Sequence, residues 1–240
     1  TYPVFTRVAE EAGRIYVDLC NETWEVVEIT RDGWRVIANP PVKFRRARGM
    51  LSLPRPVGGG KLDDLRPFVN VNDDTDWILL VAWLMAALRP TGPYPVLVLQ
   101  GEQGSAKSTT ARTLKALVGP FAAPLRTIPR EERDLMIAAN NSWVVVFDNL
   151  SGLPLWLSDA LCRLATGGGF STRELYTDAE EVLFDAMRPV ILNGIDALAE
   201  RHDLVDRAII LNLPRIPDER RRDEENFWRE FEQARPRILG

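Results

Sequence analysis

A glycine-rich stretch is the part of this sequence whose residue types and spacing best suit chemistry. It follows the apolar run Val96–Leu99 and precedes Thr110–Val118, which has helical composition. The stretch has the frame GxxxxGK[ST], the Walker A pattern of a phosphate-binding loop, with Ala106 at the second glycine position. We expect the nucleotide-binding residues to be Gly101, Glu102, Gln103, Gly104, Ser105, Ala106, Lys107, Ser108 and Thr109.

The loop residues divide the expected work of holding ATP and Mg²⁺. Gly101 and Gly104 permit a tight turn, and the loop N–H groups with the following helix N-terminus attract phosphate. Lys107 would neutralise the β and γ phosphates, and the Ser108 hydroxyl would bind Mg²⁺, which prefers oxygen ligands. We expect Ala106 to be tolerated if its φ is negative at the helix start. The alternative, an ordinary strand–turn–helix with a chance lysine, is set aside because both flanking elements fit.

Two further strands end in polar residues that could complete the site. Trp143–Phe147 is apolar and is followed by Asp148 and Asn149, a Walker B pattern that predicts a carboxylate beside the metal. Asn149 replaces the acid that polarises water in many such sites, so hydrolysis would be slow or would depend on Asp148. A cap on the following helix is the structural alternative for Asp148. Asn193 ends the run Pro189–Leu192 and would sense the γ phosphate, although Asn-Gly is also a common turn.

The elements that must position these residues predict an α/β fold. Apolar segments alternate with helical stretches, which indicates a mostly parallel sheet covered on both faces. We expect five strands, at Val96–Leu99, Leu125–Ile128, Trp143–Phe147, Pro189–Leu192 and Ala208–Leu213. Asp73–Asp76 would cap a helix that runs to about Leu88.

The organisation outside this core is simpler. Residues 1–60 are predicted to form a small β-rich piece with an Asp32–Gly33 turn and a linker at Pro54–Gly60, residues 61–215 the ATPase core, and residues 216–240 a charged helical tail. One histidine and two distant cysteines exclude a Cys/His zinc site. The net charge of −4 confines any nucleic-acid contact to a local patch. No apolar run is long enough to span a membrane, so we expect a cytoplasmic protein.

Taken in order, five segments resemble superfamily 3 helicases, in particular the AAA+ ATPase part of primase-helicases of viruses, phages and integrated mobile elements. The segments are the Walker A loop, Trp143–Asn149, Thr166–Tyr176, Pro189–Asn193 and Asp203–Ile210. The resemblance implies ATP hydrolysis that drives translocation on DNA, single-stranded by expectation, in replication of a mobile or phage-like element. It also implies a ring, expected to be a hexamer, in which Arg207 is an arginine finger toward the neighbouring subunit's ATP.

The resemblance also implies a DNA-gripping hairpin at residues 167–187, with Arg173 and Tyr176 as its pattern residues. Its tip, Thr177–Glu181, is acidic, whereas a loop that follows phosphates should be basic. A structural salt bridge and a packed ring are the alternatives for Arg173 and Tyr176. A second candidate DNA surface is the basic patch of Lys43, Arg45, Arg46 and Arg48, which could equally be a solvated strand edge.

Two rival functions remain open. An ATP-switched assembly module with weak hydrolysis and no unwinding would explain Asn149 and the acidic hairpin tip. A small-molecule kinase could use the same phosphate loop, but the sequence shows no obvious motif for an acceptor base. Arg207 could pair within the chain with Asp203 or Asp206 rather than reach a neighbour.

Overall fold

The computed structural model describes residues 2–168, 170–173, 181–184, 187–194 and 201–240. Its centre is a parallel four-stranded sheet in the order β12–β7–β11–β8. The strands are β7 (Val96–Gln100), β8 (Val145–Leu150), β11 (Val190–Gly194) and β12 (Ala208–Asn212). All residues of β11 and the first four of β7 are buried, as expected for strands covered on both faces.

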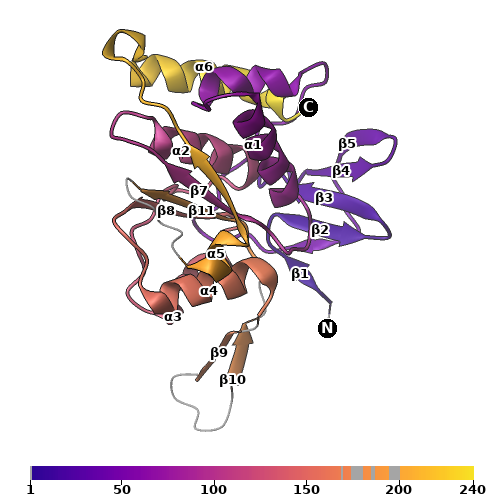
Figure 1. Ribbon diagram of the computed structural model, residues 1–240. Coiled ribbons are helices and arrows are strands. Elements are labelled where there is room, and N and C mark those ends of the chain that lie inside the picture. Colours follow the sequence, from indigo (N-terminus) through magenta and orange to yellow (C-terminus); the bar gives the residue numbers. More distant parts are fainter. Residues whose placement is uncertain (1, 169, 174–180, 185–186, 195–200) are drawn as a thin grey trace.

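Helices cover both faces of this sheet (Figure 1). One face carries α1 (Asp74–Ala87) and α2 (Lys107–Val118), and the other carries α3 (Glu132–Asn141), α4 (Leu155–Thr166) and the short α5 (His202–Val205). Helix α1 begins as predicted, since the Asp73 side chain accepts a hydrogen bond from the Asp76 N–H at 3.0 Å. The two layers of helices bury the alternating side chains of the strands in separate apolar clusters.

The prediction of a fifth strand at Leu125–Ile128 is wrong. This segment makes only an isolated parallel bridge, Arg126 to Phe147, at the free edge of β8. The Arg126 N–H donates to Val146 and its carbonyl accepts from Asp148. Pro124 and Pro129 flank the segment, and proline supplies no N–H for a ladder, which accounts for pairing that stops after one residue.

The N-terminal region is β-rich, as predicted. An antiparallel sheet has the order β2–β3–β4–β5, and β1 and β6 form a separate parallel pair. The strands are β1 (Val4–Phe5), β2 (Val8–Glu11), β3 (Arg14–Asp18), β4 (Val26–Thr30), β5 (Gly33–Ile37) and β6 (Lys43–Phe44). Val8, Val17 and Val27 join the same apolar cluster as α1, so this sheet packs directly on the core.

Within the described residues, the remaining elements are two 3₁₀ helices, one hairpin and the C-terminal helix. They are η1 (Leu62–Phe68), β9 (Phe170–Arg173), β10 (Glu181–Phe184), η2 (Asp218–Arg220) and α6 (Glu224–Ile238). Strands β9 and β10 are antiparallel, which confirms a hairpin in the expected segment, and they extend away from the helices in Figure 1. Helix α6 packs on η1 through Phe68, Phe227 and Phe231. Among the described residues, no helix combines the length and apolar character that crossing a membrane requires.

Candidate functional site: a phosphate loop beside a basic cavity

The loop between β7 and α2 is a tight turn with three residues at positive φ. These are Gly101 at +146°, Gly104 at +87° and Ala106 at +59°. A Cβ on Gly101 would lie 2.5 Å from the Leu213 carbonyl oxygen, so this position requires glycine for space as well as for conformation. The condition under which alanine was expected to be tolerated, a negative φ, is not met, because Ala106 precedes the first helical residue in the left-handed region. The turn thus forces an L-residue into a conformation that glycine adopts freely.

Lys107 lies inside this turn as the first residue of α2. Its ammonium group donates to the carbonyls of Gly101 at 2.7 Å and Glu102 at 2.9 Å, and lies 3.4 Å from the Ser105 Oγ. Burial lowers the pKa of Lys107 below its ordinary value, and the Asp148 carboxylate acts in the opposite direction. Three oxygens of the loop itself therefore surround the Lys107 ammonium group and hold it inside the turn.

A chain of hydrogen bonds joins the loop to the ends of two neighbouring strands. The Ser108 hydroxyl donates to Asp148 Oδ1 at 2.8 Å, and the Asn193 amide also donates to this oxygen. Asn193 is buried, and its amide oxygen accepts the Asn149 backbone N–H at 2.9 Å. The carboxyl ends of parallel strands meet at one edge of the sheet, which brings these distant residues together as predicted.

Two alternative interpretations of these residues are now excluded by geometry. Helix α4 begins after Pro154 without a side-chain cap, so Asp148 does not cap it. Asn193 is a residue of β11 whose amide makes specific hydrogen bonds, so it is more than a turn former.

The 2.8 Å distance between the Ser108 hydroxyl and Asp148 Oδ1 also fits a magnesium ion. Two adjacent ligands of an octahedral ion, each about 2.1 Å from it, lie about 3 Å apart.

The role of Asn149 in the structure differs from the role that the sequence suggested. Its φ is +57°, in the left-handed region that asparagine tolerates better than most residues. The side chain is exposed, while the backbone N–H fixes the orientation of Asn193. The residue type at this position therefore has a conformational reason that is independent of proton transfer.

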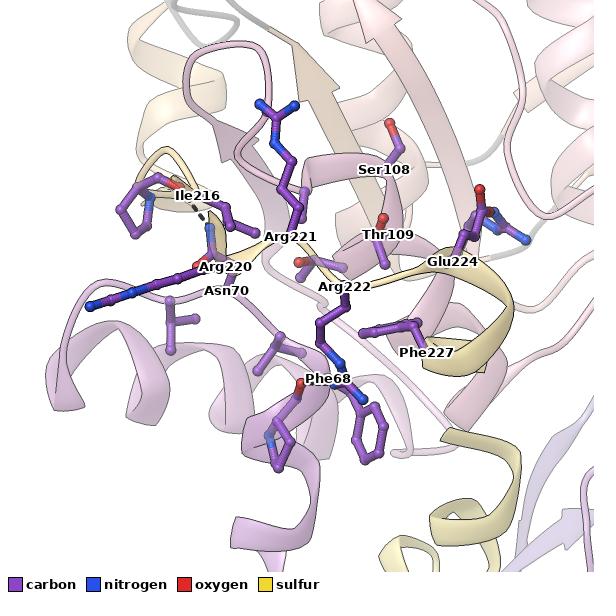
Figure 2. A pocket seen from close by; sticks show the side chains of 18 of the residues that line it. Phe68, Asn70, Ser108, Thr109, Ile216, Arg220, Arg221, Arg222, Glu224 and Phe227 are labelled. Carbon is purple, nitrogen blue, oxygen red and sulfur yellow. Dashed lines mark hydrogen bonds and ion pairs between the residues drawn. The ribbon is translucent and has the colours of Figure 1, made fainter. Parts of the chain in front are cut away.

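A cavity of about 990 Å³ opens beside the loop (Figure 2). Its walls come from η1 and the following residues, from the start of α2, and from the segment between β12 and α6. Apolar side chains such as Phe68, Ile216 and Phe227 form one part of the lining. The cationic part consists of Arg112, Arg215, Arg220, Arg221 and Arg222.

These wall residues were missed in the sequence, where η1 had no motif and residues 214–222 were assigned to a domain boundary. Asn70 connects the two segments, since its amide donates to the carbonyls of Ser105 at 2.9 Å and Pro214 at 2.6 Å. The Ile216 N–H donates to the Gly104 carbonyl at 3.1 Å. The only signal available was the run Arg220–Arg222 followed by aromatic residues at helical spacing.

Arg207 lies at the amino ends of the parallel strands, whereas the loop lies at their carboxyl ends. Ala208 pairs with Val96 and Asn212 pairs with Gln100, so Arg207 precedes the strands and the loop follows them. Six residues of strand separate the two levels, about 20 Å at 3.3 Å per residue. The exposed guanidinium donates to the Asp203 carbonyl at 2.6 Å, and Asp203 itself pairs with Arg201. Arg207 therefore cannot reach the glycine-rich loop of its own chain.

The candidate DNA-contact residues fall into separate environments. Arg46 is bound to Asp18 at 2.6 Å and stacks on Trp24 at 3.7 Å, so it holds the N-terminal sheet together rather than forming an open patch. Arg45 donates to the Asn140 side chain at 2.8 Å. Lys43 and Arg48 are exposed. Arg173 ends β9, and Tyr176 lies outside the described residues.

Comparison with known proteins supports this architecture. A comparison with curated proteins finds no significant match. Two apo structures of the NrS-1 C-terminal region resemble this chain, with TM-scores of 0.55 and 0.54, each at 13% sequence identity over 90% of this chain and 63% of the NrS-1 chain. A JCV helicase structure is a weaker match, with a TM-score of 0.44, 14% identity and coverage of 68% and 48%.

The two NrS-1 structures share the fold with this chain, which spans less than two thirds of their length. A family model described as actinomycete integrative conjugative element replication protein matches residues 62–240, the part that carries the loop, the sheet and the cavity walls. This match confirms the expectation of a replication protein from a mobile element. The chain belongs to the replication protein family of actinomycete integrative conjugative elements.

Proposed function

We propose that this chain is the ATP-hydrolysing motor of its replication protein, an AAA+ ATPase similar to superfamily 3 helicases that moves on DNA. The observation that carries the proposal is the hydrogen-bonded set of Ser108, Asp148 and Asn193 beside Lys107. Membership of a replication protein family supports a role on DNA. We also propose the domain division predicted from the sequence, with a β-rich region at residues 1–60, an ATPase core at 61–215 and a helical tail at 216–240.

The chemistry would be attack of water on the γ phosphorus of ATP. The new P–O bond forms as the bond to the bridging oxygen breaks, ADP leaves, and the proton of the water passes to a phosphate oxygen or to Asp148. Lys107 would exchange its loop carbonyls for β and γ oxygens, and Asn193 would orient the γ phosphate or the water. Mg²⁺, held by Ser108 and Asp148, would supply charge stabilisation for the transferring group.

The cavity supports a second part of the proposal, the position of the nucleoside. The phosphate end of the site is at Ser108, and the apolar wall of Phe68 and Phe227 lies further along the same cavity. Aromatic and aliphatic walls suit a purine ring, and pockets of 300 to 1,000 Å³ are typical for ligands of this size. Helix α6, in the predicted charged helical tail, would then be a wall of the base site.

The loop assignment is tested by Lys107→Ala with Lys61→Ala as the control, because Lys61 is exposed and distant in sequence from the loop. Loss of a charge-assisted partner costs about 1.5 to 3 kcal/mol, which weakens binding by roughly ten-fold to over a hundred-fold. Titration of a fluorescent ATP analogue measures this effect. Equal affinity in both variants would contradict the phosphate-loop assignment. Turnover that rises with single-stranded DNA would support the motor role.

Action of Arg207 in a neighbouring chain is tested by mixing two inactive proteins. Lys107→Ala and Arg207→Ala should each lack turnover alone, and mixed assemblies should recover part of it because some interfaces contain both intact residues. Such fingers change turnover on the order of a thousand-fold, so a minority of intact interfaces is measurable. Mixed assemblies without recovery would remove the trans role of Arg207 and with it the main argument for a hexameric ring.

A second candidate function, an ATP-switched assembly module with weak hydrolysis, is favoured by Asn149. No carboxylate follows Asp148 there, and the backbone of Asn149 is used to orient Asn193. This candidate predicts nucleotide-dependent assembly with turnover that DNA does not change.

A further inference from the structure

One guanidinium group covers the aromatic wall of the cavity. The Cζ atom of Arg222 lies 5.8 Å from the ring centroid of Phe68 and 5.1 Å from the ring centroid of Phe227. Both distances are typical of a cation over an aromatic face. Figure 2 shows the Arg222 side chain directed toward these two rings. A flat ligand therefore cannot lie against the covered faces of the rings unless Arg222 moves.

Two interactions hold the Arg222 guanidinium in place. Its Nη1 donates to the Pro67 carbonyl oxygen at 3.1 Å, and its Nη2 makes an ion pair with the Glu230 carboxylate. Pro67 belongs to η1 and Glu230 to α6, so the guanidinium joins the two elements that form this wall. The Arg222 side chain is nevertheless 37% exposed. It is therefore fixed in position and still accessible from the cavity.

The direction of these bonds decides how a flat ligand can approach Arg222. The N–H groups of a guanidinium lie in its plane, so neither bond uses a face of the plane. A nucleobase that displaced Arg222 would break the bond to Pro67 and the ion pair with Glu230, and charge-assisted bonds are the strong ones. A nucleobase that stacks on the outer face of the guanidinium breaks neither. Because the side chain is already fixed, stacking also costs little additional side-chain entropy.

The preceding arginine lies at the other end of the cavity. A Cβ on Gly104 of the phosphate loop would be 2.8 Å from Nη2 of Arg221, which also pairs with Asp218 at 3.0 Å. Figure 2 shows the side chains of Arg221 and Arg222 pointing in opposite directions. Two consecutive arginines thus mark the two ends of the cavity, one beside the loop and one at the aromatic wall.

We propose that Arg222 is the residue on which the nucleobase stacks, and that this contact makes the site select purine over pyrimidine nucleoside triphosphates. The inference rests on the proposed function, because it takes the phosphate groups to lie at the loop. Arginine planes stack on nucleobases. A purine covers more of the plane than a pyrimidine does, and stacking strength sets base preference where edge hydrogen bonds do not. Phe68 and Phe227 support the inner side of the guanidinium.

The first experiment compares ATP with inorganic tripolyphosphate, which has the phosphates and no base. Isothermal titration calorimetry with Mg²⁺ measures both ligands on Arg222→Ala and Arg222→Lys. Both variants should bind ATP roughly five-fold to over a hundred-fold more weakly, the range expected for loss of a stacked base, and should bind tripolyphosphate as the unchanged protein does. Arg229→Ala is the matched control, because Arg229 is exposed on α6 and does not line this cavity.

The Arg222→Lys variant separates stacking from charge and from support of α6. Lysine keeps a cation for Glu230 but has no plane, and it decides the question if Arg222→Ala folds poorly. Binding of ATP by Arg222→Lys at the affinity of the unchanged protein would overturn the proposal. Tighter ATP binding by Arg222→Ala would also overturn it, because the uncovered phenylalanine rings would then be the base site. Equal weakening of ATP and tripolyphosphate would place the effect at the phosphate end, with the same consequence.

The second experiment tests the substrate class by titration with ATP, GTP, CTP and UTP. In the unchanged protein both purine nucleotides should bind more tightly than both pyrimidine nucleotides, and the ratio of affinities should approach one in Arg222→Ala. Equal affinities in the unchanged protein, or the same ratio in Arg222→Ala, would contradict the proposal. A protein that binds GTP no better than CTP selects the edge of adenine instead of a stacked purine, which would also contradict it.

The stacking role and the proposed function can fail separately. Binding of tripolyphosphate that is lost in Lys107→Ala would support the phosphate loop, whatever the Arg222 variants do. If that binding is present and Arg222→Lys binds ATP normally, the phosphate site stands and only the stacking role is lost. If the unchanged protein binds neither ATP nor tripolyphosphate, the proposed function fails and the stacking role fails with it.

Discussion

Ala106 is the position where the phosphate loop departs from its frame, and replacing it with glycine is expected to stabilise the protein. Its φ of +59° and ψ of +30° lie in the left-handed region. This conformation costs an L-residue about 1 to 2 kcal/mol. Glycine loses about 0.5 to 1 kcal/mol more than alanine through chain entropy on folding. The difference favours Ala106→Gly by about 0.5 to 1 kcal/mol, and by about 1 to 4 °C in melting temperature for a chain of this length.

The sign of the change is the informative result, and α2 supplies its matched control. Ala116 is in the interior of the same helix, where glycine is expected to destabilise by about 1 kcal/mol. Urea titration of both variants separates them by about 1.5 to 2 kcal/mol, with the unchanged protein between them. Equal losses of stability in Ala106→Gly and Ala116→Gly would refute the strained backbone. A binding titration with the ATP analogue is run in parallel, and affinity should not fall in Ala106→Gly because the N–H of residue 106 is kept.

Three other changes have expected outcomes. Asn149→Asp should raise ATP turnover, because aspartate tolerates the left-handed backbone and can accept a proton. Asn149→Glu should raise turnover less. Identical steady-state rates in the unchanged protein and the two variants would contradict this reasoning. Arg46→Ala should lower the free energy of unfolding by about 3 kcal/mol because it leaves the buried Asp18 carboxylate without its ion pair. Arg48→Ala should change the free energy of unfolding by less than about 0.5 kcal/mol, and similar denaturant midpoints for the two variants would contradict the structural role of Arg46. Burial lowers the pKa of Lys115 from 10.5 to about 7, so the unfolded chain binds one proton more between these pH values and stability rises with pH there, by up to about 1.4 kcal/mol per unit. Lys115→Met should remove this slope in melting temperatures measured from pH 7 to 9, and parallel profiles would show that Lys115 is not its source.

The sequence by itself determined which polar residues meet at the carboxyl ends of the parallel strands. Lys107 and Ser108 stand at fixed spacing from β7, and Asp148 and Asn193 each end an apolar run. These are local patterns, and a single rule about parallel strands then places their ends together. The hydrogen bonds from Ser108 and Asn193 to Asp148 follow from that rule.

The cavity, in contrast, was decided by tertiary structure. Its walls combine residues 67–71 with residues 214–228. The Asn70 amide connects the two segments by hydrogen bonds to backbone carbonyls, which cannot be predicted from a pattern of side chains. The environment of Arg46 was also decided by tertiary structure. The sequence places Arg46 in a basic patch, whereas the structure places it against Asp18 and Trp24. Sequence spacing reports neighbours on one element, whereas these contacts depend on how separate elements pack.

Backbone conformation is the last feature that the sequence did not reveal. The positive φ of Ala106 and Asn149 follows from the path that the chain must take between β7 and α2 and at the end of β8. Alanine has no intrinsic preference for this region, so its residue type carried no signal. Packing and loop closure impose the conformation because the strain of one residue is small beside the apolar burial that the completed sheet and its helices provide.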